Sequence, residues 1–94
     1  MNDDLEFDSN KQTINQIIHN DIDFEEADTV LDDPLSITNE DYGDYEGEQR
    51  YFTLGMSNQY RLLVVIWTIR DENIRIISAR LAEPHQRKTY ENRR

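Results

Sequence analysis

The sequence contains no cysteine, and its 94 residues include only three glycines, two prolines and two histidines. Without cysteine the chain cannot form a disulfide, a thiolate zinc site or a cysteine nucleophile. It also lacks a Gly-rich phosphate loop, a Gly-x-Ser-x-Gly motif and a zinc-spaced histidine pair. His19 and His85 are therefore the only side chains whose unperturbed pKa lies near neutral pH, and most familiar motif-based enzyme classes are excluded.

Long apolar runs are missing as well. No stretch approaches the roughly 20 apolar residues of a membrane span, and the start of the chain, Asn2-Asp3-Asp4, is acidic where a secretion signal would be basic and then apolar. We therefore expect a cytoplasmic protein with no membrane association. The length predicts one domain over residues 1–94, with 1–4 and 91–94 frayed.

Acidic residues are plentiful, but they are unevenly distributed. Residues 1–48 carry sixteen Asp and Glu against Lys11 alone, whereas residues 49–94 carry nine Arg and Lys against four Asp and Glu. The acidic half suits either a solvated surface or a basic partner. The basic half could contact phosphate locally, although the net charge of −10 would oppose a polyanion at long range.

Helices are predicted before and after a set of strands. Three isoleucines fall on one helical face within residues 10–20. A second helix is expected to begin at Asp23, with Glu26 as the partner of a capping box, and to end at Pro34. A third helix is expected from Glu83 to about Tyr90.

The region between these helices alternates like an antiparallel sheet. Leu5-Glu6-Phe7 could add a brief edge strand, and Leu35-Ser36-Ile37-Thr38 a further one, before a polar loop over residues 39–47. Three longer β runs follow: Arg50–Leu54, Arg61–Ile69 and Ile74–Leu81. The predicted fold is therefore α+β, with an antiparallel meander of four to five strands, two N-terminal helices and one C-terminal helix.

Two hairpin registers decide which side chains share a sheet face. With Asp71-Glu72 as one tip and residues 56–59 as the other loop, Arg50 and Arg80 lie on one face, offset by two residues and able to reach a common anion. That face is predicted to carry Arg50, Phe52, Leu54, Arg61, Leu63, Val65, Trp67, Ile76, Ser78 and Arg80. The opposite face is predicted to form the core under the helices: Leu62, Val64, Ile66, Ile77, Ala79 and Leu81. A one-residue slip or a bulge would reverse this assignment.

Arg50 and Arg80 stand out because a charge inside a hydrophobic strand needs a partner or a role. A salt bridge to the acidic half is the competing interpretation. Trp67 could stack on a base, although a strand tryptophan is more often part of the core. His19 could act in catalysis or could simply cap the end of the first helix.

Short segments between Phe7 and Tyr90 together resemble the BrnT-type ribonuclease toxins of bacterial toxin–antitoxin pairs. The segments are Phe7-Asp8, Lys11, Asn15, His19, Phe24-Glu25-Glu26-Ala27, Asp32-Asp33-Pro34-Leu35, Gly47-Glu48-Gln49-Arg50, Arg61-Leu62-Leu63-Val64-Val65 and Ile74-Arg75-Ile76-Ile77-Ser78-Ala79-Arg80. The last of these is the most specific. Where the family usually reads Lys-His-Gly, this chain reads Ile18-His19-Asn20, and an alternative gapping aligns Asn20 with the family histidine.

The resemblance implies a RelE-like fold and metal-independent endoribonuclease activity without a cofactor. It also implies a BrnA-type ribbon–helix–helix antitoxin as partner, with RNA as substrate and operator DNA bound only through the antitoxin. Cleavage would proceed by attack of a 2′-hydroxyl on the adjacent phosphate.

Site roles follow from this chemistry. Arg50 and Arg80 would stabilise the phosphate and the transition state. His19 would be the acid or base, and Glu48 a weaker candidate for the same role. Lys11 and Arg61 would position the RNA backbone, with Trp67 as a further RNA contact.

Two other functions remain open from the sequence. The chain could be a weak or inactive toxin homologue that acts as an antitoxin-binding co-repressor, which the missing lysine before His19 favours. It could also be an acidic mimic of nucleic acid that occupies a basic protein. RNA cleavage separates the toxin from the co-repressor, and a small basic neighbouring reading frame separates both from the mimic.

Overall fold

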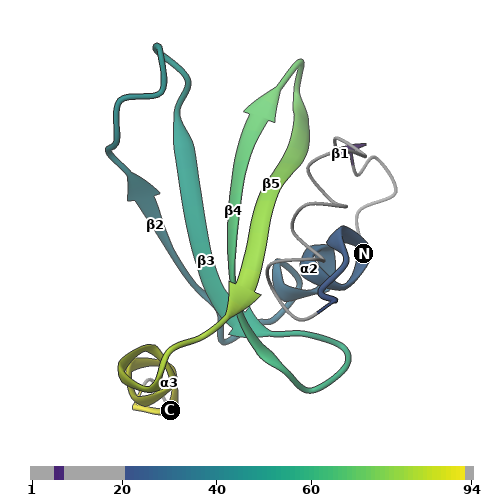
Figure 1. The fold of residues 1–94 in the computed structure, drawn as a ribbon, viewed down its shortest axis with the longest axis vertical. Coiled ribbons are helices and arrows are strands. Elements are labelled where there is room, and N and C mark those ends of the chain that lie inside the picture. The colour runs from purple at the N-terminus through teal and green to yellow at the C-terminus, as the bar shows by residue number, and fades with distance from the viewer. Residues whose placement is uncertain (1–5, 8–20, 93–94) are drawn as a thin grey trace.

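A computed structural model describes residues 6–7 and 21–92, which form a five-stranded sheet with one helix before the long strands and one after them (Figure 1). The strands are β1 (Glu6–Phe7), β2 (Ile37–Asp41), β3 (Arg50–Met56), β4 (Leu62–Arg70) and β5 (Asn73–Leu81). Their order is β1-β5-β4-β3-β2. Strands β2 to β5 form the predicted antiparallel meander, and β1 adds to its edge parallel to β5. The α+β class is confirmed, while the helix predicted over residues 10–20 lies outside the described residues.

Both described helices begin where their capping residues predict. Helix α2 (Phe24–Val30) starts after Asp23, whose carboxylate accepts a 2.7 Å hydrogen bond from the Glu26 backbone N–H. Helix α3 (Pro84–Glu91) starts after Glu83, which forms a reciprocal capping box with Gln86. These bonds satisfy backbone donors that a helix start leaves without partners. In the residues described, neither helix is long and apolar enough to cross a membrane.

The helices pack on opposite faces of the sheet, so the fold has two apolar clusters. Under α2 the buried residues are Ile22, Phe24, Ala27, Val30, Leu63, Val65, Ile76 and Ala79. Under α3 they are Leu54, Leu62, Val64 and Tyr90, with Phe52 and Ile66 packed against them. The prediction of one core under all the helices is therefore wrong, and both faces of β4 are buried.

The register of the first hairpin differs from the predicted one. Phe52 pairs with Ile66 and Arg50 with Thr68, because the connection runs over residues 57–61 and not 56–59. The Ser57 backbone N–H donates to the Arg61 carbonyl at 2.8 Å and closes this longer loop. The three-residue shift turns the side chains of β4 to the face opposite the one predicted.

The second hairpin has the predicted tip but contains a bulge. Asp71 and Glu72 both adopt positive φ, at 52° and 69°, as a two-residue hairpin turn requires. Trp67 pairs with Ile76, as a tip at Asp71-Glu72 requires, but the register then shifts, so Ile66 pairs with Ser78 and Val64 with Arg80. Ile77 is the extra residue, and it is half-buried, not part of a core cluster.

Asp33 joins elements that lie on both sides of the sheet. Its carboxylate accepts hydrogen bonds from the Leu35 and Met56 backbone N–H groups at 2.9 and 2.8 Å, and from the Tyr90 hydroxyl at 2.6 Å. Met56 ends β3, and Tyr90 lies in the last turn of α3. The segment that follows α2 is thus tied directly to the sheet and to the second helix.

Candidate functional site

Arg50 and Arg80 share the sheet face on which α3 packs, which we term the arginine face. Across β4 they pair with Thr68 and Val64, so four residues separate them along the sheet. This offset corresponds to about 13 Å along the strands and about 10 Å across them. The predicted common face is confirmed, but the predicted offset of two residues is wrong. The two arginines therefore lie at opposite ends of one face and do not form a single anion site.

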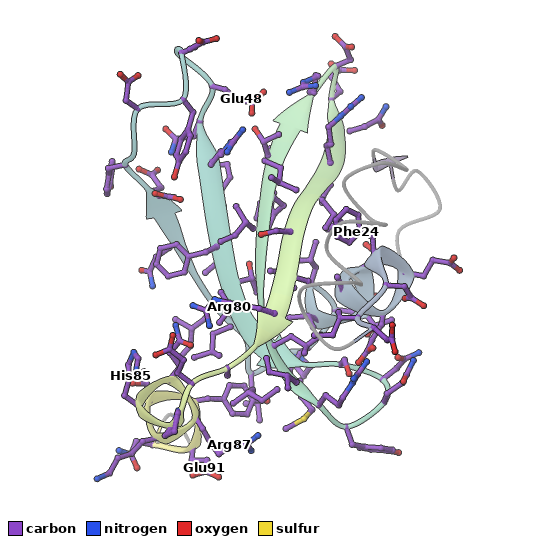
Figure 2. All side chains as sticks on the ribbon, viewed as in Figure 1. Phe24, Glu48, Arg80, His85, Arg87 and Glu91 are labelled. Carbon is purple, nitrogen blue, oxygen red and sulfur yellow. The ribbon has the colours of Figure 1, made fainter. Side chains whose placement is uncertain are left out.

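One end of the arginine face holds a cluster of charges around Glu48 (Figure 2). The Glu48 carboxylate accepts a 3.2 Å hydrogen bond from Nε of Arg50 and a further bond from Arg70. The bond from Arg70, together with that from Arg50, lowers the pKa of Glu48. Glu48 is therefore ionised at neutral pH and cannot serve as an acid.

The guanidinium of Arg50 also lies on an aromatic ring. Its central carbon is 4.2 Å from the centroid of the Tyr45 ring, which is within cation–π range. The Tyr45 hydroxyl donates to Oδ2 of Asp41 at 2.7 Å. Asp41 pairs with Arg50 across β2 and β3, so the loop between these two strands folds back over the strand that carries the arginine.

The other end of the arginine face is built from β5 and α3. Nη1 of Arg80 donates to the Leu81 carbonyl at 3.2 Å and to Oε1 of Gln86 at 3.1 Å, and it lies 3.9 Å from the Glu83 carboxylate. In Figure 2 the Arg80 side chain points from the end of β5 across the sheet. A hollow of about 130 Å³ lies between this helix and the sheet. Its lining residues are Ile37, Asn39, Phe52, Leu54, Val64, Gln86 and Thr89.

Arg61 and Trp67 lie on the α2 side of the sheet, whereas they were predicted on the same face as Arg50. Nε of Arg61 donates to Glu26 of α2 at 2.9 Å, and a second nitrogen of the same guanidinium also bonds this carboxylate. Trp67 packs against the α2 core, donates to the Thr53 hydroxyl at 2.8 Å and stacks on Tyr51 with ring centroids 4.5 Å apart. The longer first hairpin loop explains both errors, because it reverses the faces of β4.

Lys11 and His19 lie outside the described residues, so the structure does not place them relative to either arginine. Within residues 6–7 and 21–92, no three His, Asp or Glu side chains are grouped as a metal site. The described part of the candidate site therefore consists of arginines, one ionised glutamate and their supports.

Sequence reasoning missed Tyr45 and Gln86. Tyr45 lies in a polar segment that was expected to be a loop without a specific role, and only the pairing of β2 with β3 brings it under Arg50. Gln86 was expected to belong to a helix, and the capping box directs its amide toward Arg80. The sequence offered one signal for Tyr45, which is that it lies five residues before an arginine in a predicted strand. That spacing does not indicate a contact unless the strand register is known.

Comparison with known proteins identifies relatives of the chain by family and by fold. The family model described as "Ribonuclease toxin, BrnT, of type II toxin-antitoxin system" matches residues 7–86. The crystal structure of the Brucella abortus ribonuclease toxin BrnT superposes with a TM-score of 0.59 at 21% sequence identity, covering 84% of this chain and 95% of that one. No curated protein matches the chain. The superposition supports the fold, and the matched range includes every residue proposed for the site.

Proposed function

Since the chain belongs to the BrnT family of ribonuclease toxins of type II toxin–antitoxin systems, we propose that it cleaves RNA without a metal ion. In this reaction an RNA 2′-hydroxyl attacks the adjacent phosphorus, the 5′-oxygen of the next nucleotide leaves, and a 2′,3′-cyclic phosphate forms. A base must take the hydroxyl proton, an acid must protonate the leaving oxygen, and cations must stabilise the developing charge.

The observation that carries this proposal is that Arg50 and Arg80 lie on one sheet face. Both belong to segments by which the chain resembles the family, and each is oriented by a neighbouring side chain: Arg50 by Glu48 and Arg80 by Gln86. Because they are separated by four residues along the sheet, we assign them to different phosphates of one RNA strand. One guanidinium would stabilise the scissile phosphate, and the other would hold the strand in register.

The remaining roles follow from protonation. We assign His19 as the proton donor to the leaving oxygen, because histidine changes charge near neutral pH. Glu48, which stays ionised, is the candidate base and also holds Arg50. Lys11 would contact the RNA backbone. We assign structural roles to Arg61 and Trp67, because each is hydrogen-bonded on the α2 side of the sheet.

A toxin of a type II system has an antitoxin as its partner, and we propose one of the BrnA type. Such an antitoxin would be a ribbon–helix–helix protein that neutralises the toxin and carries it to operator DNA. We also propose that residues 1–94 form a single domain of RelE-like fold and that the protein acts in the cytoplasm, where its RNA substrate is found.

The test is cleavage of purified RNA by the arginine variants in the presence of a chelator. Arg50→Ala and Arg80→Ala should both lower the rate. The loss should be roughly 10²–10³-fold for the arginine at the scissile phosphate, which is the cost of removing one preorganised charge-stabilising donor, and smaller for the arginine that holds the strand. Lysine at either position should restore only part of the rate, since it cannot make two parallel hydrogen bonds. His19→Ala should lower the rate and remove an ionisation near neutral pH from the rate profile.

The matched control is Arg87→Ala, which removes an exposed arginine from α3 and should leave cleavage unchanged. Circular dichroism should show each variant folded. Full activity of Arg80→Ala would contradict the assigned site, and activity abolished by the chelator would contradict the metal-free mechanism. A folded wild-type chain that binds its antitoxin without cleaving RNA would instead identify a co-repressor.

A further inference from the structure

We propose that Tyr45 is a positioning residue, whose ring fixes the Arg50 guanidinium on the arginine face. The inference rests on the proposed function, because the task of Arg50 there is to hold an RNA phosphate. Tyr45 itself would touch no reacting atom. It would restrict the Arg50 side chain to its binding conformation before the substrate arrives, so that less conformational entropy is lost on binding.

The contacts of Arg50 divide its guanidinium into a held part and an available part. The Tyr45 ring lies under the guanidinium, whose central carbon is 4.2 Å from the ring centroid. Glu48 occupies Nε at 3.2 Å. Within the described residues, the two terminal nitrogens have no hydrogen-bond partner. The pair of donors that grips a phosphate oxygen pair is thus available, while the rest of the side chain is fixed.

Tyr45 is itself held from two directions. Its hydroxyl donates to Oδ2 of Asp41 at 2.7 Å, and the other oxygen of the same carboxylate accepts the Gly43 backbone N–H at 3.2 Å. The ring rests on the α-carbon of Gly43, where an added Cβ would come within 2.6 Å of Cζ and the hydroxyl oxygen. Glycine at this position therefore leaves the space that the ring occupies beneath Arg50.

The same loop provides a matched control. Tyr42 is 84% exposed, and the Glu40 carboxylate raises the pKa of its hydroxyl as Asp41 raises that of Tyr45. In the part of the chain that the structure describes, an arginine lies over the ring of Tyr45 and none over that of Tyr42. Substitution of Tyr42 thus removes a tyrosine–carboxylate pair from the loop without removing a support from Arg50.

The experiment compares Tyr45→Leu, Tyr45→Phe and Tyr42→Leu in RNA cleavage by the full chain. Tyr45→Leu keeps apolar bulk but loses the π face, and it should lower kcat/KM by about 5–10-fold. Tyr45→Phe keeps the ring and should retain activity within about 2-fold, and Tyr42→Leu should match the wild type.

Gly43→Ala should reproduce the loss of Tyr45→Leu, because its new methyl group displaces the ring. In an Arg50→Ala background, Tyr45→Leu should have no further effect.

Two outcomes would overturn the inference: equal activity of Tyr45→Leu and Tyr42→Leu, or full additivity of Tyr45→Leu with Arg50→Ala. Failure of the proposed function has a different signature, namely a folded wild-type chain that cleaves no RNA. In that case NMR of the Arg50 side chain decides whether Tyr45 fixes it. An upfield ring-current shift of its Hε that is lost in Tyr45→Leu, but kept in Tyr42→Leu, supports positioning, and a shift that is equal in both variants rejects it.

Discussion

Glu26 is only 3% exposed, yet its buried carboxylate has hydrogen-bond donors on both oxygens. Its carboxylate accepts hydrogen bonds from the Arg61 guanidinium and, at 2.6 Å, from the Ser57 hydroxyl. Burial alone would raise the pKa of Glu26, but the hydrogen bonds from Arg61 and Ser57 outweigh burial and lower it. The acid that the sequence suggested as a capping partner therefore connects α2 to the first hairpin loop.

We predict that Glu26→Gln lowers the free energy of unfolding by about 2–3 kcal/mol, less than for a wholly buried pair because Arg61 remains partly exposed. Urea unfolding measures the change. Glu25→Gln is the control, because Glu25 lies in the same helical turn but is exposed, and it should have little effect. An equal loss in both variants would show that general charge, not the pair, is responsible.

The same pair has a defined pH dependence. The folded-state pKa of Glu26 is lower than that of an unfolded glutamate, about 4.3, so protonation disfavours the folded state. The stability contributed by ionised Glu26 is complete above that value and is lost as the pH falls through the folded-state pKa. The difference in stability between wild type and Glu26→Gln should accordingly shrink in acid.

At the level of elements, the bulge in β5 divides neighbouring isoleucines between two environments. Ile76 is fully buried in the α2 core, whereas Ile77 is the half-buried bulge residue. Ile76→Asp should cost about 3–5 kcal/mol, because it buries a charge without a partner, and should unfold the chain at 37 °C. Ile77→Asp should leave a cooperatively folding protein with a smaller loss. Thermal melts followed by circular dichroism distinguish the two, and an equal loss would contradict the observed register.

The elements themselves could largely be predicted from the sequence, because alternation, capping residues and the Asp71-Glu72 turn are local signals. The register of the first hairpin could not. Ser57 closes its loop through the Arg61 carbonyl and is held there by Glu26, which lies 31 residues earlier in the chain. A contact of this range leaves no local pattern.

The position of the bulge at Ile77 could not be predicted from the sequence either. This second register error affects which face Arg80 occupies. The shift of the first hairpin reverses β4 relative to β3, and the bulge reverses the end of β5 relative to β4. The two reversals cancel for Arg50 and Arg80, so their common face was predicted correctly although the intervening strand was not. Their spacing was wrong, because the first hairpin shifts the β4 partner of Arg50 by three residues and the bulge shifts that of Arg80 by only one.

At the scale of the whole molecule, the charge of −10 should govern how fast a basic antitoxin associates. We predict that the association rate constant falls by about 10-fold or more between 50 and 500 mM salt, whereas the dissociation rate constant changes little. Stopped-flow mixing of toxin and antitoxin gives both constants. A salt-independent association rate would show that the acidic surface does not steer this encounter.

Asp33 has a consequence for how the molecule opens. Asp33 lies in the segment that follows α2, and its carboxylate accepts hydrogen bonds from the end of β3 and from the Tyr90 hydroxyl of α3. Neither helix can therefore detach without breaking a bond that also holds the other. Local fraying of α3 is therefore coupled to the opposite side of the sheet. Amide hydrogen exchange of α3 should then follow that of α2 and β3, so that the arginine face is exposed or protected together with the rest of the domain and not by movement of one helix alone.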